Sequence, residues 1–188
     1  MARRILHRIT LLFFIFALVG PSFSLAEQRS SFYSFKERLV NGEDISFAGF
    51  EGKVVLVANV AVKCGTSSQF NDLQKLYSSK PEDLIILGVA SNDFTGMEPE
   101  NHKFGEVCQQ SYGVEFPVVE LSRIKGQGKS ELYEFLTETG PKETRGEVSF
   151  NFEKFLIGRK GEVRMRFGSF TGVLSGTVSK ELRSLLDE

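Results

Sequence analysis

The sequence is poor in the residue types that most often bind metals or carry acid–base chemistry. Its 188 residues include two cysteines, Cys64 and Cys108, and two histidines, of which His102 alone lies beyond the first ten residues. These are too few ligands for a typical zinc site, and no cofactor is indicated. A Cys–His dyad would require His102 to fold against Cys64. Tryptophan is absent, so the 18 phenylalanines must fill most large core positions.

A hydrophobic run long enough to cross a bilayer is also missing. Residues 1–8 are basic, residues 9–20 are almost purely apolar, and Ser24 and Ala26 form a small-x-small cleavage signal. The apolar run is shorter than the ~20 residues that span a membrane. Residues 1–26 are therefore interpreted as a signal peptide, with an uncleaved anchor as the alternative. We expect an exported protein, periplasmic as first choice and secreted as second, without stable membrane association after cleavage.

An excess of positive charge is absent as well. The 23 basic residues lose Arg3, Arg4 and Arg8 with the leader, which leaves 20 against 24 acidic residues. A slightly acidic domain matches neither nucleic acid nor an anionic membrane surface as a partner. Residues 27–188 are long enough for a single domain with its own core, and they show no internal repeat.

The hydrophobic pattern of residues 27–188 predicts an α/β domain. Asn41-Gly42 lies between two short strand patterns, which is typical of a β-hairpin. Two apolar runs, residues 54–61 and 84–90, flank a helical pattern and predict a parallel βαβ unit. Helices are also expected at residues 101–112, 130–138 and 175–187, strands at 150–158 and 162–167, and a strand start or loop at Pro117. This order predicts a thioredoxin-like fold: a central mixed sheet flanked by helices, with an N-terminal β-hairpin.

Cys64 directly follows the first of the two apolar runs. A strand that ends in a turn and leads into a helix is expected to place the thiol at the helix N-terminus. Unpaired N–H groups and the helix dipole would favour the thiolate there. The neighbouring Lys63 would add a favourable charge, unless it is a solvated loop lysine. Cys64 is therefore the candidate nucleophile.

Five motifs, in chain order, resemble the glutathione peroxidase family in its cysteine-containing form. They are GKVVLVANVA with KCG within residues 52–65, the positions Asn92, Phe94, Gly96 and Glu98-Pro99, then VEFP at 114–117, LYEFL at 132–136 and NFEKFL at 151–156. The resemblance implies a peroxidase cycle. Cys64 would attack the peroxide O–O bond and become a sulfenic acid.

Cys108 resembles the resolving cysteine of the thioredoxin-dependent members, because it lies just before Tyr112-Gly113-Val114. The resemblance implies a Cys64–Cys108 disulfide, later opened by a thioredoxin-like protein or, as second choice, by glutathione. The alternatives for Cys108 are a buried, inert thiol and a permanent structural disulfide.

The family's active site also implies three side chains around the sulfur, a glutamine, a tryptophan and an asparagine. Asn151 keeps the asparagine, whereas Asp93 stands at the glutamine position and Phe150 at the tryptophan position. Phe150 has no N–H donor, and an ionised Asp93 near the sulfur would disfavour the thiolate. Asp93 is expected to bind the backbone of its own loop, with a protonated donor or an ion pair with Lys63 as alternatives.

Other charged residues are expected at the surface. His102 lies at a helix start, which is more often an exposed position than a catalytic one. The alternating residues Arg159, Lys160, Arg164 and Arg166 on the last hairpin are expected to form a solvated sheet face.

Together these features predict an exported thiol peroxidase that reduces hydrogen peroxide or organic hydroperoxides through Cys64. One alternative is a non-catalytic or weakly active domain with a structural disulfide, which the changes at Asp93 and Phe150 favour. Another is a thiol–disulfide oxidoreductase, which the missing Cys-x-x-Cys motif argues against. The short segment at residues 125–129 favours a monomer over a dimer.

Overall fold

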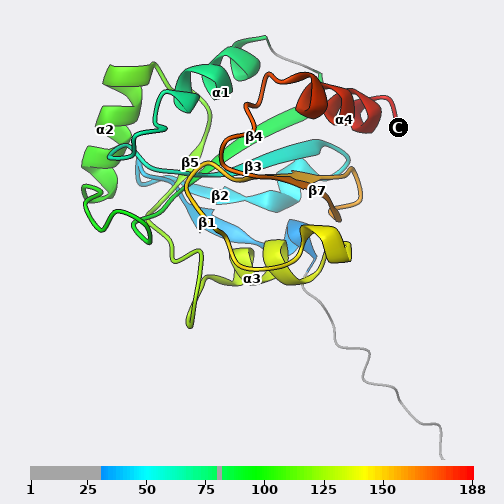
Figure 1. Ribbon diagram of the computed structural model, residues 1–188, viewed down its shortest axis with the longest axis horizontal. Helices are drawn as coiled ribbons and strands as arrows, with labels where there is room; N and C mark the ends of the chain where they lie inside the picture. Colours follow the sequence, from blue (N-terminus) through cyan, green and yellow to red (C-terminus); the bar gives the residue numbers. More distant parts are fainter. Residues whose placement is uncertain (1–30, 80–81) are drawn as a thin grey trace, which may run out of the picture.

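The computed structural model describes residues 31–79 and 82–188, so the signal-peptide interpretation lies outside the described residues. A five-stranded sheet with the order β5-β4-β3-β6-β7 forms the centre, and a two-stranded sheet, β1-β2, lies beside it (Figure 1). The strands of the central sheet are β3 (Val54–Val60), β4 (Leu84–Ala90), β5 (Val118–Val119), β6 (Lys154–Ile157) and β7 (Val163–Phe167). Within the two described stretches, no helix has the length and apolar character needed to cross a membrane.

The central sheet has a parallel and an antiparallel part. β3 pairs in parallel with β4, and β4 with the short strand β5. On its other side β3 pairs antiparallel with β6, and β6 with β7. Lys154, the first residue of β6, therefore lies opposite both Ala58 near the end of β3 and Phe167 at the end of β7. The ends of β3, β4 and β7 and the start of β6 share one edge of the sheet, which we call the active edge.

Residues of β3 alternate between two hydrophobic cores, which is why this strand is buried throughout. Val54, Leu56 and Ala58 belong to the core that contains α1 (Gln69–Ser78), α2 (Asn101–Tyr112) and α4 (Gly176–Leu186). Val55 and Val57 belong to the core that contains α3 (Glu131–Glu138). Figure 1 shows α1 and α4 on one side of the sheet and α3 on the other. Both cysteines lie in the α1–α2–α4 core.

The predicted N-terminal hairpin is confirmed, with short strands β1 (Lys36–Arg38) and β2 (Asp44–Ser46). Three 3₁₀ helices complete the fold: η1 (Phe32–Ser34), η2 (Phe47–Phe50) and η3 (Lys142–Thr144). Phenylalanine supplies much of the α3 core, as expected. Phe32 and Phe47, for example, are both fully buried, with ring centroids 5.0 Å apart.

The thioredoxin-like fold is as the sequence predicts, and most element boundaries agree closely. α2 spans the expected residues and ends at Gly113, which adopts the left-handed conformation. One boundary is wrong: the strand expected from residue 150 begins at Lys154. The main chain turns at Phe152, whose φ of 63° is incompatible with a strand.

Candidate active site

Cys64 lies in a run of tight turns between β3 and α1. The N–H of Ser67 donates to the carbonyl of Cys64 at 3.0 Å, and the N–H of Gln69 donates to Thr66 at 3.0 Å. These two N–H groups are therefore occupied by turn hydrogen bonds, and α1 itself begins at Gln69, five residues after Cys64. Its Sγ lies 3.1 Å from Oγ1 of Thr66, and the residue is 8% exposed. A hydroxyl that is able to donate to a thiolate is thus the polar group beside the sulfur.

Glu98 fixes the residues that precede Cys64. Its buried carboxylate accepts the N–H of Val62 at 2.7 Å and the N–H of Lys63 at 2.9 Å. Charge-assisted bonds of this kind are stronger than neutral ones. Sequence reasoning matched Glu98 only as part of a Glu-Pro motif and missed this role. A glutamate in a polar loop carries no local signal that its partners lie 35 residues earlier.

Asp93, which follows β4, binds backbone, but the prediction that this backbone belongs to its own loop is wrong. Its Oδ2 accepts the N–H of Ile124 at 2.6 Å and of Lys125 at 3.2 Å. Among the ion pairs of the described residues, none joins Asp93 to Lys63. The carboxylate therefore ties two loops together.

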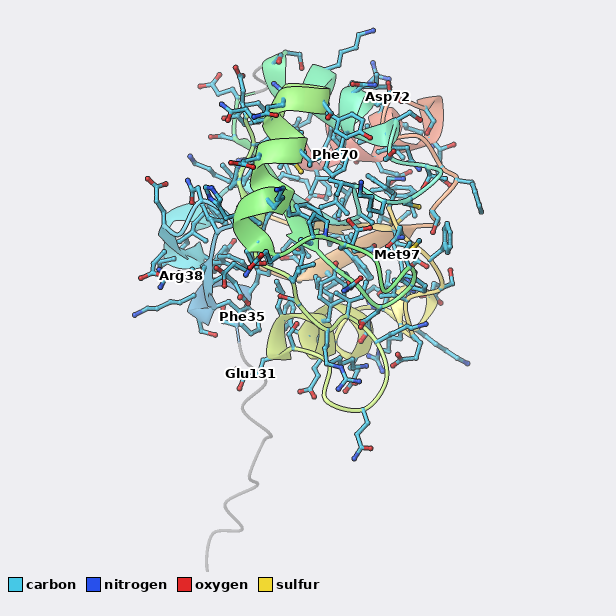
Figure 2. All side chains as sticks on the ribbon, turned by 90° about the vertical axis from the view of Figure 1, so that its left-hand side faces the viewer. Phe35, Arg38, Phe70, Asp72, Met97 and Glu131 are labelled. Atoms are coloured by element: carbon cyan, nitrogen blue, oxygen red, sulfur yellow. The ribbon has the colours of Figure 1, made fainter. Side chains whose placement is uncertain are left out.

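Phe150 belongs to an apolar patch that is partly open to solvent. Its ring lies 5.5 Å from that of Phe94 and is stacked at 6.2 Å on that of Phe170. Phe170 is 82% exposed, and Met97, labelled in Figure 2, is 68% exposed. We call Phe94, Phe150 and Phe170 the aromatic patch. It joins the loops that follow β4 and β7 to the turn that precedes β6.

Asn151 lies directly before the left-handed Phe152 and is completely buried. Its Nδ2 and Oδ1 have no hydrogen-bond partner among the residues that the structure describes. Buried amides normally pair, so the hydrogen-bonding capacity of this one is left unused among the described residues. We call these two atoms the open amide.

Cys108 projects from α2 into the core that also contains Cys64, and it is 2% exposed. Burial, with a smaller contribution from the negative charge of Glu98, raises the pKa of its thiol to about 12. Cys108 is therefore protonated at neutral pH. Both cysteines are free thiols in this structure.

The remaining sequence candidates lie outside this arrangement. The side chain of His102 is 84% exposed and pairs with Glu106 at 3.2 Å, as expected of a surface residue. Lys63 is exposed. No group of three potential metal-ligating side chains occurs in residues 31–79 and 82–188.

The solvated face expected for the last hairpin is wrong for Arg166. Its side chain is 13% exposed and pairs with buried Glu153 at 2.6 Å. It also donates to the carbonyls of Gly146 and Glu147, at 2.7 Å each. Arg166 therefore fixes the loop that leads to Phe150. Lys160, by contrast, is exposed as expected.

The fold and the site together define a class of thiol-based redox enzyme. One cysteine follows the central strand at the active edge, and a second lies in the same core on α2. The chain has no Cys-x-x-Cys motif, which separates it from the common dithiol oxidoreductases of this fold.

Within this class the chain belongs to the glutathione peroxidase family. The sequence model of that family, described as glutathione peroxidase, matches residues 32–137. A glutathione peroxidase of Lactococcus lactis subsp. cremoris is 40% identical over 143 residues, which cover 75% of this chain and 91% of that protein. The glutathione peroxidase-like peroxiredoxin 2 of Saccharomyces cerevisiae is 36% identical over 163 residues, which cover 85% of this chain and 99% of that protein. The chain is accordingly a peroxidase, as its motifs predict.

Solved structures agree with this assignment. The crystal structure of Trgpx in its apo form is 29% identical, with a TM-score of 0.68, and the match covers 85% of this chain and 97% of that one. A thioredoxin-like superfamily protein is 17% identical with a TM-score of 0.57, covering 85% of this chain and 98% of that one. This second similarity shows the thioredoxin-like fold alone.

Proposed function

We propose that Cys64 is the cysteine that reacts with peroxide. Its thiolate attacks one oxygen of hydrogen peroxide or of an organic hydroperoxide, and the O–O bond breaks as the S–O bond forms. The sulfur is oxidised to a sulfenic acid. The departing oxygen takes a proton and leaves as water or as an alcohol. Thr66, at 3.1 Å from Sγ, is placed to donate to the thiolate before the attack.

The observation that carries this proposal is the open amide of Asn151. A buried amide whose described surroundings offer no partner is a donor held ready for charge that develops during the reaction. Asn151 lies in the turn before β6, and Cys64 follows β3, so both lie at the active edge. The departing oxygen, which gains negative charge as the O–O bond breaks, is the group that such a donor stabilises.

The other two positions of the implied active site contribute less. The carboxylate of Asp93 is held by the N–H groups of Ile124 and Lys125, and Phe150 has no N–H to donate. A hydrogen bond to a charged group contributes about 1.5–3 kcal/mol. Each missing donor therefore costs roughly one to two decades in rate. We expect a peroxidase slower than one with all three donors.

Cys108 is proposed to complete the cycle as the resolving cysteine. Its thiol condenses with the Cys64 sulfenic acid, which releases water and forms a Cys64–Cys108 disulfide. A dithiol then reduces this disulfide. Because Cys108 is buried and its pKa is about 12, α2 must open locally before the sulfur reacts. A thioredoxin-like protein suits a disulfide intermediate better than glutathione. Relatives such as the yeast protein, named a peroxiredoxin, support this choice.

The cellular location, the domain organisation and the oligomeric state are proposed from the sequence. Residues 1–26 have the pattern of a signal peptide, which supports export to the periplasm or, as second choice, secretion. The mature chain, residues 27–188, is proposed to be a single domain and a monomer. We propose no nucleic-acid partner and no stable membrane association after the leader is removed.

The proposal is tested by mixing reduced protein with one equivalent of hydrogen peroxide and counting free thiols over seconds. Wild type should lose both thiols, whereas Cys64→Ser should lose neither. Cys108→Ser should stop at a sulfenic acid that dimedone traps on Cys64. Thioredoxin with its reductase should restore both thiols of the wild type. Thiols that persist for minutes, or a disulfide that thioredoxin fails to open, would count against the proposed cycle.

A further inference from the structure

Two completely buried asparagines lie at the active edge, and they are bonded in opposite ways. Asn59, near the end of β3, uses both ends of its amide. Its Nδ2 donates to the carbonyl of Phe150 at 3.1 Å, and its Oδ1 accepts the N–H of Glu153 at 3.0 Å. Asn151 lies between those two partners and carries the open amide. One asparagine thus holds the segment from which the other projects.

The main chain of Asn59 binds the same segment. Its N–H donates to the carbonyl of Glu153 at 3.3 Å, and its carbonyl accepts the N–H of Phe152 at 2.7 Å. Residue 59 therefore contacts residues 150, 152 and 153 through four hydrogen bonds, two from its main chain and two from its side chain. A different residue type at position 59 would keep the main-chain pair and lose the side-chain pair.

The conformation of Phe152 explains why residues 150–153 need such an anchor. Its φ of 63° is unfavourable for a bulky residue, and such conformations persist only where the surroundings fix them. The ring of Phe152 is buried against Phe70, at 5.3 Å between centroids. Without the side-chain bonds of Asn59, the turn would relax toward an ordinary φ. Asn151 would then rotate with it and its amide would pair with nearby backbone.

The ion pair between Glu153 and Arg166 does not replace this anchor. The Glu153 carboxylate accepts from Ser149 and from Arg166, so it fixes the loop that enters the turn. Only Asn59 has side-chain bonds to the main chain on both sides of Asn151 among the side-chain hydrogen bonds of the described residues.

We propose that Asn59 is a positioning residue for peroxide reduction. It holds residues 150–153 in the conformation that keeps the Asn151 amide open to the reacting oxygen atoms. This inference rests on the proposed function of Cys64 and Asn151 and assigns the residue on which the geometry of that site depends.

A double-mutant cycle on the whole protein tests this role. The readout is the second-order rate constant for oxidation of Cys64 by hydrogen peroxide. Asn151→Ala should lower it by roughly tenfold or more, because a donor to developing charge is lost. Asn59→Ala should lower it by a similar factor. The double variant should be no slower than Asn151→Ala alone, since residues that act as a unit are not additive.

Thr137→Ala is the matched control for lost stability. Thr137 is a buried residue of α3 whose hydroxyl donates to the carbonyl of Tyr133 at 2.6 Å, in the core remote from the cysteines. This variant should lower the melting temperature and leave the rate constant unchanged.

Asn59→Asp gives a second measurement, the pH dependence of the rate constant relative to wild type. A purely structural role of Asn59 would not produce this pH dependence. A protonated carboxyl has the shape of the amide, accepts from Glu153 and donates to the Phe150 carbonyl, whereas the ionised form repels that carbonyl. Burial raises the pKa of such a carboxyl. The charged neighbours are Glu153, paired with Arg166, and Lys154, which is bonded to Gln69. The ratio of the variant's rate constant to that of the wild type should therefore rise as the pH falls.

Several outcomes would overturn the inference. One is an Asn59→Ala variant that destabilises the fold but keeps the wild-type rate constant within a factor of two. Another is an effect of Asn59→Ala that multiplies with that of Asn151→Ala. The inference would also be contradicted if the ratio of the Asn59→Asp rate constant to that of the wild type did not change with pH. These results leave peroxide reduction by Cys64 intact. A wild type that does not consume peroxide contradicts the proposed function itself, and the positioning role with it.

Discussion

Phe150 presents a ring to the active edge but no hydrogen-bond donor. It is half-buried in the aromatic patch, next to exposed Phe170, so a larger ring has room there. We expect Phe150→Trp to raise the rate constant for Cys64 oxidation by about one to two decades, because the indole N–H adds a donor to developing charge. Stopped-flow mixing with hydrogen peroxide measures this rate.

Phe150→Leu is the control for this change, since it alters the ring without adding a donor, and it should not be faster than the wild type. A tryptophan variant no faster than the leucine variant would show that position 150 serves packing alone. Asp93→Gln is not expected to give the same gain. It removes the charged partner of the Ile124 N–H, and the loop that would carry the new amide loosens.

Glu98 binds the backbone before Cys64 and acts electrostatically on Cys108. Its carboxylate holds the N–H groups of Val62 and Lys63, and its charge contributes to the raised pKa of Cys108. Because a negative charge disfavours a thiolate, we expect Glu98→Gln to lower the pKa of Cys108 below about 12. Burial is unchanged, so the pKa should stay above the ordinary thiol value. The rate of alkylation of Cys108 against pH, in a Cys64→Ser background, measures the shift.

Glu106→Gln serves as the control for Glu98→Gln. Glu106 lies on α2 beside Cys108, but its side chain is 45% exposed and pairs with His102. Its removal should leave the titration of Cys108 unchanged. Equal titration curves for the two glutamine variants would mean that burial alone sets the pKa of Cys108.

Among the single elements, we expect the C-terminal end of α2 to control access to Cys108. Gly113 adopts φ 62° and donates its N–H to the carbonyl of Gln109 at 3.0 Å, while Val114 donates to the carbonyl of Cys108 at 3.2 Å. A Cβ at position 113 would meet no atom within 4 Å, so alanine there acts on conformation alone. The left-handed conformation costs alanine about 1–2 kcal/mol.

We therefore expect Gly113→Ala to accelerate native-state alkylation of Cys108 by roughly 5- to 30-fold, because α2 opens more readily. The experiment uses the Cys64→Ser background, in which Cys108 is the only thiol. Gly49→Ala is the matched control, since a Cβ at position 49 also meets no atom within 4 Å and Gly49 has no left-handed φ. Equal alkylation rates in both variants would contradict the role of the cap.

The elements differ in how well the sequence predicts them. α2 and β4 follow from local pattern alone. β4 is a continuous apolar run, whereas α2 places Phe104 and Cys108 four residues apart on one face, and Gly113 marks its end. The prediction of a strand from residue 150 is wrong for residues 150–153, although the sequence Phe150-Asn151-Phe152 is typical of a strand. There the bonds of Asn59, distant by about ninety positions, outweigh local preference.

The residues of the candidate site also differ in how well the sequence predicts their roles. Cys64, Cys108 and Asn151 were found from motifs, whereas Glu98, Asn59 and Arg166 act through partners remote in sequence. In the sequence, nothing distinguishes these three residues from an ordinary glutamate in a loop, asparagine in a strand or arginine in a hairpin. Only the folded chain shows that their partners are the turns that carry the reactive residues.

At the scale of the whole molecule, Lys154 joins three segments. Its side chain is fully buried and donates to Gln69 at the start of α1 and to the carbonyls of Ser169 and Thr171 after β7. Burial lowers its pKa to about 8, a shift that the nearby charges of Glu153 and Asp72 oppose.

This pKa sets the sign of a pH effect on stability. The folded value lies below the unfolded one of 10.5, so the unfolded chain binds more protons between pH 8 and 10.5. Burying the ammonium is thus unfavourable below pH 8, and this cost disappears as the pH rises. We expect the stability of wild type relative to Lys154→Met to increase from pH 7.5 to pH 10, measured by denaturant unfolding of both proteins. A difference that is constant or falls with pH would contradict the shift.

The alternation of β3 between two cores has a consequence for repeated turnover. Both cysteines, and the helix α2 that opens in the proposed cycle, belong to the α1–α2–α4 core, while α3 packs on the opposite face. In the proposed cycle, each oxidation would therefore disturb one half of the molecule and leave the other half intact. After reduction, α2 would close against a sheet that had kept its shape. The return of α2 to its place would then be a local repacking step on a sheet that is already folded. Such a step would be faster than refolding of the entire chain and would carry a lower risk of aggregation.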